Sequence, residues 1–163
     1  MKEYYIFNLK KEFAKLYKER PSELFYIFNR IYYMKEVDKN YGYNLFEQIC
    51  NFIDKKEINE YLYNIYKDKM MYSYNENEHV INNLFLNEIS ILKVKNSNLR
   101  LETNKEDCSF LKDLNSFNNT YFVCDFKNQE FFFLKNNKHT YGIQKSVKYP
   151  GSKNNDDGRK IHL

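Results

Sequence analysis

The amino-acid sequence predicts one α+β domain, in which helices pack on one face of a mostly antiparallel sheet. Its 163 residues are close to the usual length of a single domain. Hydrophobic residues make up 42% of the chain and aromatic residues 18%, enough to build a core without disulfides or a metal. Apolar residues recur at helical spacing up to about Lys67, and strand patterns prevail after it. The order strand, helices, strands, helix, hairpin favours antiparallel pairing.

A strand and two helices are predicted at the start of the chain. Residues 4–9 are mainly aromatic and β-branched, which is typical of a strand. The pattern then changes to that of a helix over about residues 10–19. Pro21 suits the first turn of a second helix, over about residues 21–35, because the missing N–H of proline costs nothing there.

Two more helices are expected after a polar loop around Gly42. Asn44 is followed three residues later by Glu47, a capping-box pattern that predicts the start of the third helix. Asp54 and Glu57 repeat the pattern for a fourth helix. The expected apolar face of the third helix comprises Leu45, Phe46, Ile49 and Phe52.

The second half of the chain is predicted to form strands interrupted by one short helix. The expected strands cover residues 70–74, 80–86, 88–95, 121–126 and 130–134, with the partner of the third beginning at Leu99. Thr103 and Glu106 form a further capping box, which predicts a helix carrying Leu111 and Leu114. Residues 1–136 are therefore expected to form the single domain. Residues 137–163 are expected to be a flexible C-terminal extension, because residues 152–160 contain nothing apolar.

The cysteines and the apolar runs predict a cytoplasmic protein without membrane contact. The three cysteines are odd in number and form no CxxC pair, which argues against a disulfide framework and a zinc site. Cys50 and Cys124 lie in apolar runs and are expected to be buried. Lys2-Glu3 leads directly into an amphipathic pattern, so no signal peptide is expected. No apolar run approaches the roughly 20 residues of a membrane span.

The charge pattern favours an ordinary solvated surface over a nucleic-acid interface. The net charge is +4, and its 26 basic and 22 acidic residues are interspersed. A small basic nucleic-acid-binding module remains the alternative, because residues 131–133 are three phenylalanines between Lys127 and Lys135 and resemble a base-stacking platform. A sheet packed on its helices explains the same residues, and we therefore expect no direct contact with nucleic acid.

No catalytic motif was found in the sequence, so neither an enzyme nor a cofactor is expected. With four glycines in the chain, a phosphate-cradling loop is nearly excluded. His79 lies close to Glu76 and Glu78, which is a weak signal for a metal. An enzyme with an unrecognised carboxylate site is a third possibility.

The first helix carries the clearest candidate for a contact surface. Leu9, Phe13, Leu16 and Tyr17 span an arc of about 100°. Tyr17 lies at the edge of this arc, where an aromatic side chain can be half exposed and anchor a protein contact. The alternative is that all four side chains belong to the core.

Several segments resemble one known protein family, that of the sporulation inhibitor of replication, SirA. The opening segment, Tyr-Tyr-Ile-Phe-Asn-Leu-Lys-Lys-Glu-Phe-Ala over residues 4–14 with Tyr17 following, is similar to the start of that family. The other similar segments are Leu24-Phe25 with Phe28, Glu47-Gln48-Ile49, Phe122–Phe126 and Phe132–Asn136. The family's hairpin ends in Asn-Pro, whereas this chain has Lys135-Asn136.

The resemblance implies a cytoplasmic inhibitor of the replication initiator DnaA, as made by endospore-forming Firmicutes. Members of the family are small α+β proteins that bind the N-terminal domain I of the initiator and keep it from the origin. The contact residues of the family match Phe13, Tyr17, Gln48, Asn51 or Phe52, and Asn136 of this chain.

Overall fold

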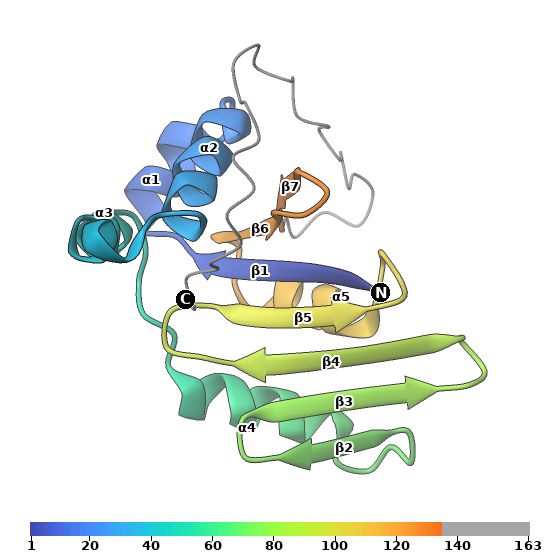
Figure 1. Cartoon of the computed structure of the whole chain (residues 1–163). Helices are drawn as coiled ribbons and strands as arrows, with labels where there is room; N and C mark the ends of the chain where they lie inside the picture. Colours follow the sequence, from blue (N-terminus) through green and yellow to red (C-terminus); the bar gives the residue numbers. More distant parts are fainter. Residues whose placement is uncertain (135–163) are drawn as a thin grey trace.

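The computed structural model describes residues 1–134 of the chain. Its seven strands form one antiparallel sheet in the order β2-β3-β4-β5-β1-β6-β7, so the N-terminal strand lies inside the sheet (Figure 1). The strands are β1 (Lys2–Asn8), β2 (Tyr72–Asn75), β3 (Glu78–Asn83), β4 (Glu88–Val94), β5 (Leu99–Thr103), β6 (Tyr121–Asp125) and β7 (Glu130–Phe133). The helices are α1 (Lys11–Tyr17), α2 (Pro21–Tyr32), the short 3-10 helix η1 (Glu36–Asp38), α3 (Lys39–Ile49), α4 (Lys55–Tyr66) and α5 (Ser109–Phe117). The predicted α+β class and the antiparallel sheet are confirmed.

The helices cover both faces of the sheet, whereas the sequence predicted that they cover one. In β1, Tyr4 and Ile6 enter a core shared with α4 and α5, while Tyr5 and Phe7 enter a second core shared with α2 and α3. Every residue of β6 is buried as well. A strand that is apolar on both sides needs cover on both sides, which explains the difference. Figure 1 shows α5 behind the sheet. It shows α1, α2 and α3 grouped together at the left of the view.

Stacked aromatic rings join α2 to the sheet. The rings of Phe7 and Phe28 lie 4.2 Å apart and nearly parallel. Those of Phe25 and Phe131 lie 4.7 Å apart. Each of these side chains is buried, and full burial of a phenylalanine contributes about 1.5–3 kcal/mol. The stacked rings therefore hold α2 against the sheet. The helices α1 and α3 precede and follow α2 in the chain.

The loop predicted around Gly42 is wrong, because α3 begins at Lys39. Gly42 is buried inside that helix, and a Cβ at its position would lie 2.8 Å from the Sδ atom of Met34. The glycine thus permits close packing against the end of α2 and does not form a turn. Asn44, expected to cap the helix, lies in its interior and is exposed.

The two other predicted capping boxes have opposite outcomes. Asp54 caps α4 as predicted, since its Oδ1 accepts a hydrogen bond of 3.1 Å from the backbone N–H of Glu57. Thr103 does not cap α5, because it is the last residue of β5. The helix begins at Ser109, whose backbone N–H and hydroxyl both donate to the carboxylate of Glu88 at 2.8 Å. The acceptor lies 21 residues earlier in the chain, where a local pattern cannot reveal it.

Candidate partner-binding surface

A short β-bridge joins the segments that carry the predicted contact residues. Leu9 and Cys50 form this antiparallel bridge. On either side of it, the N–H of Lys10 donates to the carbonyl of Ile49 at 2.9 Å, and the N–H of Asn51 donates to the carbonyl of Asn8 at 2.8 Å. The start of α1 is therefore held against the end of α3.

Phe13 and Tyr17 lie on α1, a helix with no fully buried residue. Both side chains are half buried and pack against the core that contains Phe7 and Phe28. The guanidinium of Arg20 lies 5.9 Å from the centre of the Tyr17 ring. Helical spacing predicts Leu16 in the apolar arc of this helix, but its side chain is 51% exposed. The helix thus presents both aromatic and aliphatic surface to solvent.

Gln48, Asn51 and Phe52 lie at the other side of the bridge, and all three are exposed. The side-chain amide of Asn51 donates to the carbonyl of Leu9 at 3.5 Å, which links this segment to the start of α1. Phe52 was expected on the buried face of the third helix. That expectation is wrong, because α3 ends at Ile49 and Phe52 is 48% exposed.

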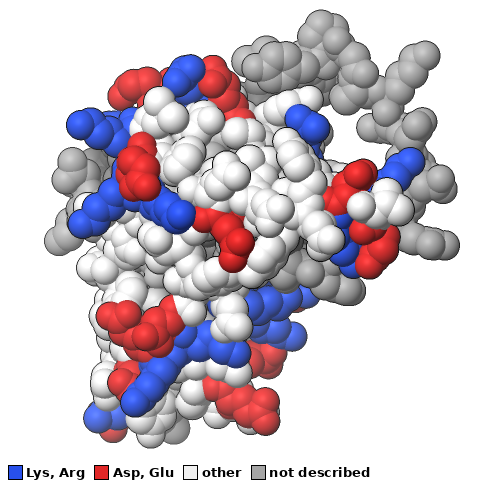
Figure 2. All heavy atoms as spheres, turned by 90° about the vertical axis from the view of Figure 1, so that its left-hand side faces the viewer, with Lys and Arg blue, Asp and Glu red and all other residues white. Residues whose placement is uncertain are grey.

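An exposed tyrosine of α3 enlarges this surface, and the sequence did not single it out. Tyr43 is 53% exposed, and its ring lies 6.4 Å from that of Phe52. Tyr41 is 60% exposed, but two residues span about 200° of a helix, so Tyr41 lies on the opposite side of α3 from Tyr43. The prediction of a loop in this segment hid the exposed position of Tyr43. Figure 2 faces the side of the molecule that carries α1 and α3 and shows an uncharged area with charged side chains around it. We call the residues Phe13, Leu16, Tyr17, Tyr43, Gln48, Asn51 and Phe52 the α1–α3 surface.

A hollow of about 310 Å³ adjoins the α1–α3 surface at Phe52. Asn8 lines it, and the Oδ1 atom of Asn8 accepts hydrogen bonds from the amide of Asn118 and the hydroxyl of Thr120, each 3.1 Å long. The full lining is Asn8, Phe52, Ile53, Asp54, Glu57, Ile58, Phe117, Asn118 and Tyr121. The flat aromatic surface therefore continues into a concave, more polar region.

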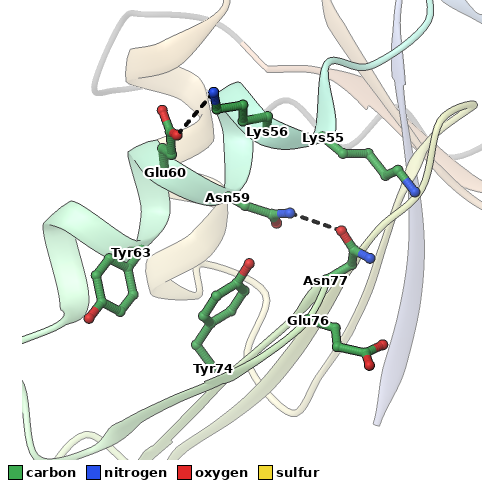
Figure 3. Close-up of a pocket in the computed structure, with 8 residues that line it drawn as sticks. All are labelled: Lys55, Lys56, Asn59, Glu60, Tyr63, Tyr74, Glu76 and Asn77. Carbon is green, nitrogen blue, oxygen red and sulfur yellow. Dashed lines mark hydrogen bonds and ion pairs between the residues drawn. The ribbon is translucent and has the colours of Figure 1, made fainter.

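A second hollow, of about 470 Å³, lies between α4 and the turn joining β2 to β3 (Figure 3). The amide of Asn59 donates to Oδ1 of Asn77 at 2.9 Å across it, and Lys56 forms an ion pair with Glu60. Tyr63 and Tyr74 line its other end, with their ring centres 5.8 Å apart. The Asn59–Asn77 hydrogen bond and the Tyr63–Tyr74 contact join α4 to the β2–β3 hairpin, so these lining side chains already have a structural role.

His79 lies behind this hollow and does not fit the weak metal signal seen in the sequence. Its ring is fully buried, with Nδ1 2.7 Å from the hydroxyl of Tyr72 and Nε2 2.9 Å from Oδ1 of Asn59. Since Asn59 donates its amide to Asn77, the Nε2–H of His79 must donate to Asn59, and Nδ1 accepts from Tyr72. Burial lowers the pKa of His79 to about 4, so the imidazole is neutral at pH 7.

The thiols are also unsuited to chemistry at neutral pH. Cys50, Cys108 and Cys124 are free and buried, as predicted for Cys50 and Cys124. Burial raises the pKa of all three, and that of Cys108 to about 11. A thiol with a raised pKa is protonated at pH 7 and is a poor nucleophile.

The three phenylalanines of the β6–β7 hairpin do not form a base-stacking platform. Phe131 and Phe132 are buried, in different cores, and Phe133 is partly buried. Nucleic-acid recognition through these rings would require exposed ring faces. The interpretation of this strand as part of a sheet packed on helices is confirmed.

Fold and surface together define a small α+β protein whose described part carries an uncharged aromatic surface, the type of surface that suits contact with another protein. The family model of the sporulation inhibitor of replication protein SirA matches residues 2–138. The chain belongs to this family, which is a family of sporulation-linked regulatory inhibitors of replication and not a known enzyme family. No curated protein matches the chain. In residues 1–134 no helix combines the length and the apolar character needed to cross a membrane.

Proposed function

We propose that this protein inhibits the initiation of DNA replication by binding domain I of the initiator DnaA in the cytoplasm. The α1–α3 surface would cover domain I and keep the initiator from the origin. One observation carries the proposal. The Leu9–Cys50 bridge brings the start of α1, which carries Phe13 and Tyr17, next to the end of α3, on the side of the molecule where Figure 2 shows a largely uncharged area.

The residues that the family resemblance assigns to the contact have suitable positions. Phe13 and Tyr17 are half buried, so each keeps a fixed orientation while exposing part of its ring. Gln48 and Asn51 are exposed at the end of α3 and just after it, where the Leu9–Cys50 bridge holds this segment against the start of α1, and both offer hydrogen-bonding groups. An aromatic centre with a polar rim is the usual composition of a protein–protein interface. Asn136 lies outside the described residues, and its part in the contact stays a prediction.

Titration calorimetry of the full chain against purified domain I tests the proposal. We expect saturable binding at tens of micromolar or below, with little change between 50 and 200 mM salt. Binding through phosphate contacts would instead fall by orders of magnitude over that range. A duplex containing the origin sequence serves as the second titrant. Absence of binding to domain I, or tight salt-sensitive binding to the duplex, would contradict the proposal.

A further inference from the structure

A second group of exposed apolar side chains lies at the end of the sheet opposite α1 and α3. Phe85 is 102% exposed and Leu84 is 85% exposed, at the turn joining β3 to β4. The group, which we call the hairpin-tip cluster, consists of Met70, Leu84, Phe85, Leu86 and Ile89. Figure 1 shows this turn at the far side of the molecule from α1 and α3. The cluster is therefore separate from the α1–α3 surface.

Backbone pairing brings the members of the cluster to the same end of the sheet. Asn82 lies opposite Ile89 in the ladder between β3 and β4. The N–H of Asn82 also donates to the carbonyl of Met71 at 2.9 Å, next to Met70. The turn that carries Phe85 begins two residues after Asn82. Met70, the turn and Ile89 thus form neighbouring parts of one exposed edge.

The turn is held in one conformation by side chains that contribute no apolar surface themselves. Oδ1 of Asn83 accepts from the N–H groups of Phe85 and Leu86 at 3.1 and 3.2 Å. Asn104 donates to the carbonyl of Asn87 and accepts from the N–H of Ile89. A turn that is already ordered in the monomer loses little conformational entropy on binding, which favours association.

We propose that the hairpin-tip cluster is the contact between two copies of this chain in a two-fold dimer. Large apolar side chains bury on the order of 150–200 Å² each. Met70, Leu84 and Phe85 are almost fully exposed and Leu86 and Ile89 about half exposed, so together they offer on the order of 600 Å². A stable interface buries roughly 800 Å² on each partner, which the cluster and its polar rim together can supply. Patches larger than a few hundred Å² are unusual on monomers.

The absence of charge in the turn suits a second copy better than a lipid surface. Residues 80–87 contain no Asp, Glu, Lys or Arg. A two-fold contact places identical residues next to each other, so an uncharged centre avoids repulsion between like charges. Segments that bind membrane surfaces usually combine apolar side chains with Lys and Arg, which attract anionic lipids. The neighbouring rim is mixed instead, with Lys105 bonded to the carbonyl of Leu86 and with exposed Glu106 and Asp107.

Sedimentation equilibrium of the full chain over about 5–500 µM tests the proposal. The mass should rise with concentration from the 20.0 kDa monomer towards twice that value. Phe85→Asp brings two like charges into the contact and should weaken the dimer by at least roughly thirtyfold. It should leave the melting temperature of the monomer unchanged, because Phe85 makes no buried contact. Val37→Asp is the matched control, since Val37 is 88% exposed on η1 and should leave the dimer intact.

Three results would overturn the proposal. A wild-type chain that stays at 20.0 kDa up to 500 µM has no such dimer. A dimer that Phe85→Asp leaves intact uses another surface. A monomer that co-sediments with vesicles of phosphatidylcholine and phosphatidylglycerol through Phe85 uses the cluster for lipid. Each of these outcomes is independent of binding to domain I, because the cluster and the α1–α3 surface share no residue.

Discussion

The backbones of Leu9 and Cys50 pair in an antiparallel bridge, although 40 residues lie between them in the chain. Leu9 follows β1 and precedes α1, and Cys50 follows α3. Both residues are buried, so the bridge belongs to the core and is not a surface contact. It fixes the relative position of two helices whose exposed residues form the candidate binding surface. The candidate surface is therefore tied to β1, a strand inside the sheet.

Tyr17→Ala and Gln48→Ala are expected to weaken binding to domain I while leaving the fold intact. Both side chains lie on the α1–α3 surface, and neither is fully buried. Loss of an aromatic anchor commonly costs about 2 kcal/mol or more, roughly thirtyfold in affinity. Calorimetry of each variant, with circular dichroism melts, measures the two effects separately. Tyr63→Ala is the control, because Tyr63 is an exposed tyrosine on α4, outside the α1–α3 surface. Equal affinity for all four proteins would show that domain I uses another surface.

Phe46→Ala and Phe52→Ala are expected to separate stability from binding. Phe46 is 2% exposed, and removing a buried phenylalanine ring costs about 3–5 kcal/mol of unfolding free energy. Phe52 is 48% exposed, so removing its ring should cost less than half of the unfolding free energy that Phe46→Ala costs. It should also reduce the affinity for domain I. Urea unfolding and calorimetry of both variants provide the comparison. The prediction fails if Phe52→Ala destabilises the protein as much as Phe46→Ala does.

Strands with a strong apolar pattern and helices with local caps could be predicted from the sequence. β6 and β7 begin where expected, as do α2 at Pro21 and α4 after Asp54. The failures arise from packing contacts that the local sequence pattern does not reveal. Gly42 was assigned to a loop because its packing partner Met34 lies on another segment.

The candidate surface was predicted in part. The exposure of Gln48 at the end of α3 follows from its place beside the buried Ile49. The exposure of Leu16 does not follow from helical spacing, because it depends on how far α1 projects beyond the core. Met70 and residues 84–86 were expected in strands, and their exposure in the structure depends on where β3 ends. Periodicity identifies the apolar face of an element but does not show whether the rest of the fold covers it.

Removal of the α4 cap is expected to cost about 1 kcal/mol of unfolding free energy. In Asp54→Ala, the N–H of Glu57 loses the acceptor that lies 3.1 Å away. Asp54→Asn keeps an acceptor oxygen at the same place and should retain most of the stability. Urea unfolding at pH 7 measures both variants. Equal destabilisation by the two substitutions would show that the charge of Asp54, and not its hydrogen bond, stabilises the helix.

His79 is expected to make the stability of the protein depend on pH between about 6.5 and 4. Its pKa falls from an ordinary 6.5 to about 4 on folding, because the imidazole is buried. Below pH 6.5 the unfolded chain therefore binds a proton that the folded chain does not bind. The contribution of His79 to stability is fully present above pH 6.5 and is lost as the pH falls towards 4. Between pH 7 and pH 5 the loss should be about 2 kcal/mol.

His79→Gln isolates this effect from the titration of the carboxylates. The variant retains a polar side chain that can bond to Tyr72 and Asn59, the two partners of the imidazole, but it cannot bind the proton. Its stability at pH 7 is expected to be lower than that of the wild type, and the gap should narrow by about 2 kcal/mol at pH 5. Urea unfolding of both proteins at the two pH values gives the four free energies that are needed. All other titrating groups are common to the two chains and cancel in the comparison. If the gap has the same size at both pH values, the imidazole titrates normally in the folded protein and water reaches it despite its burial.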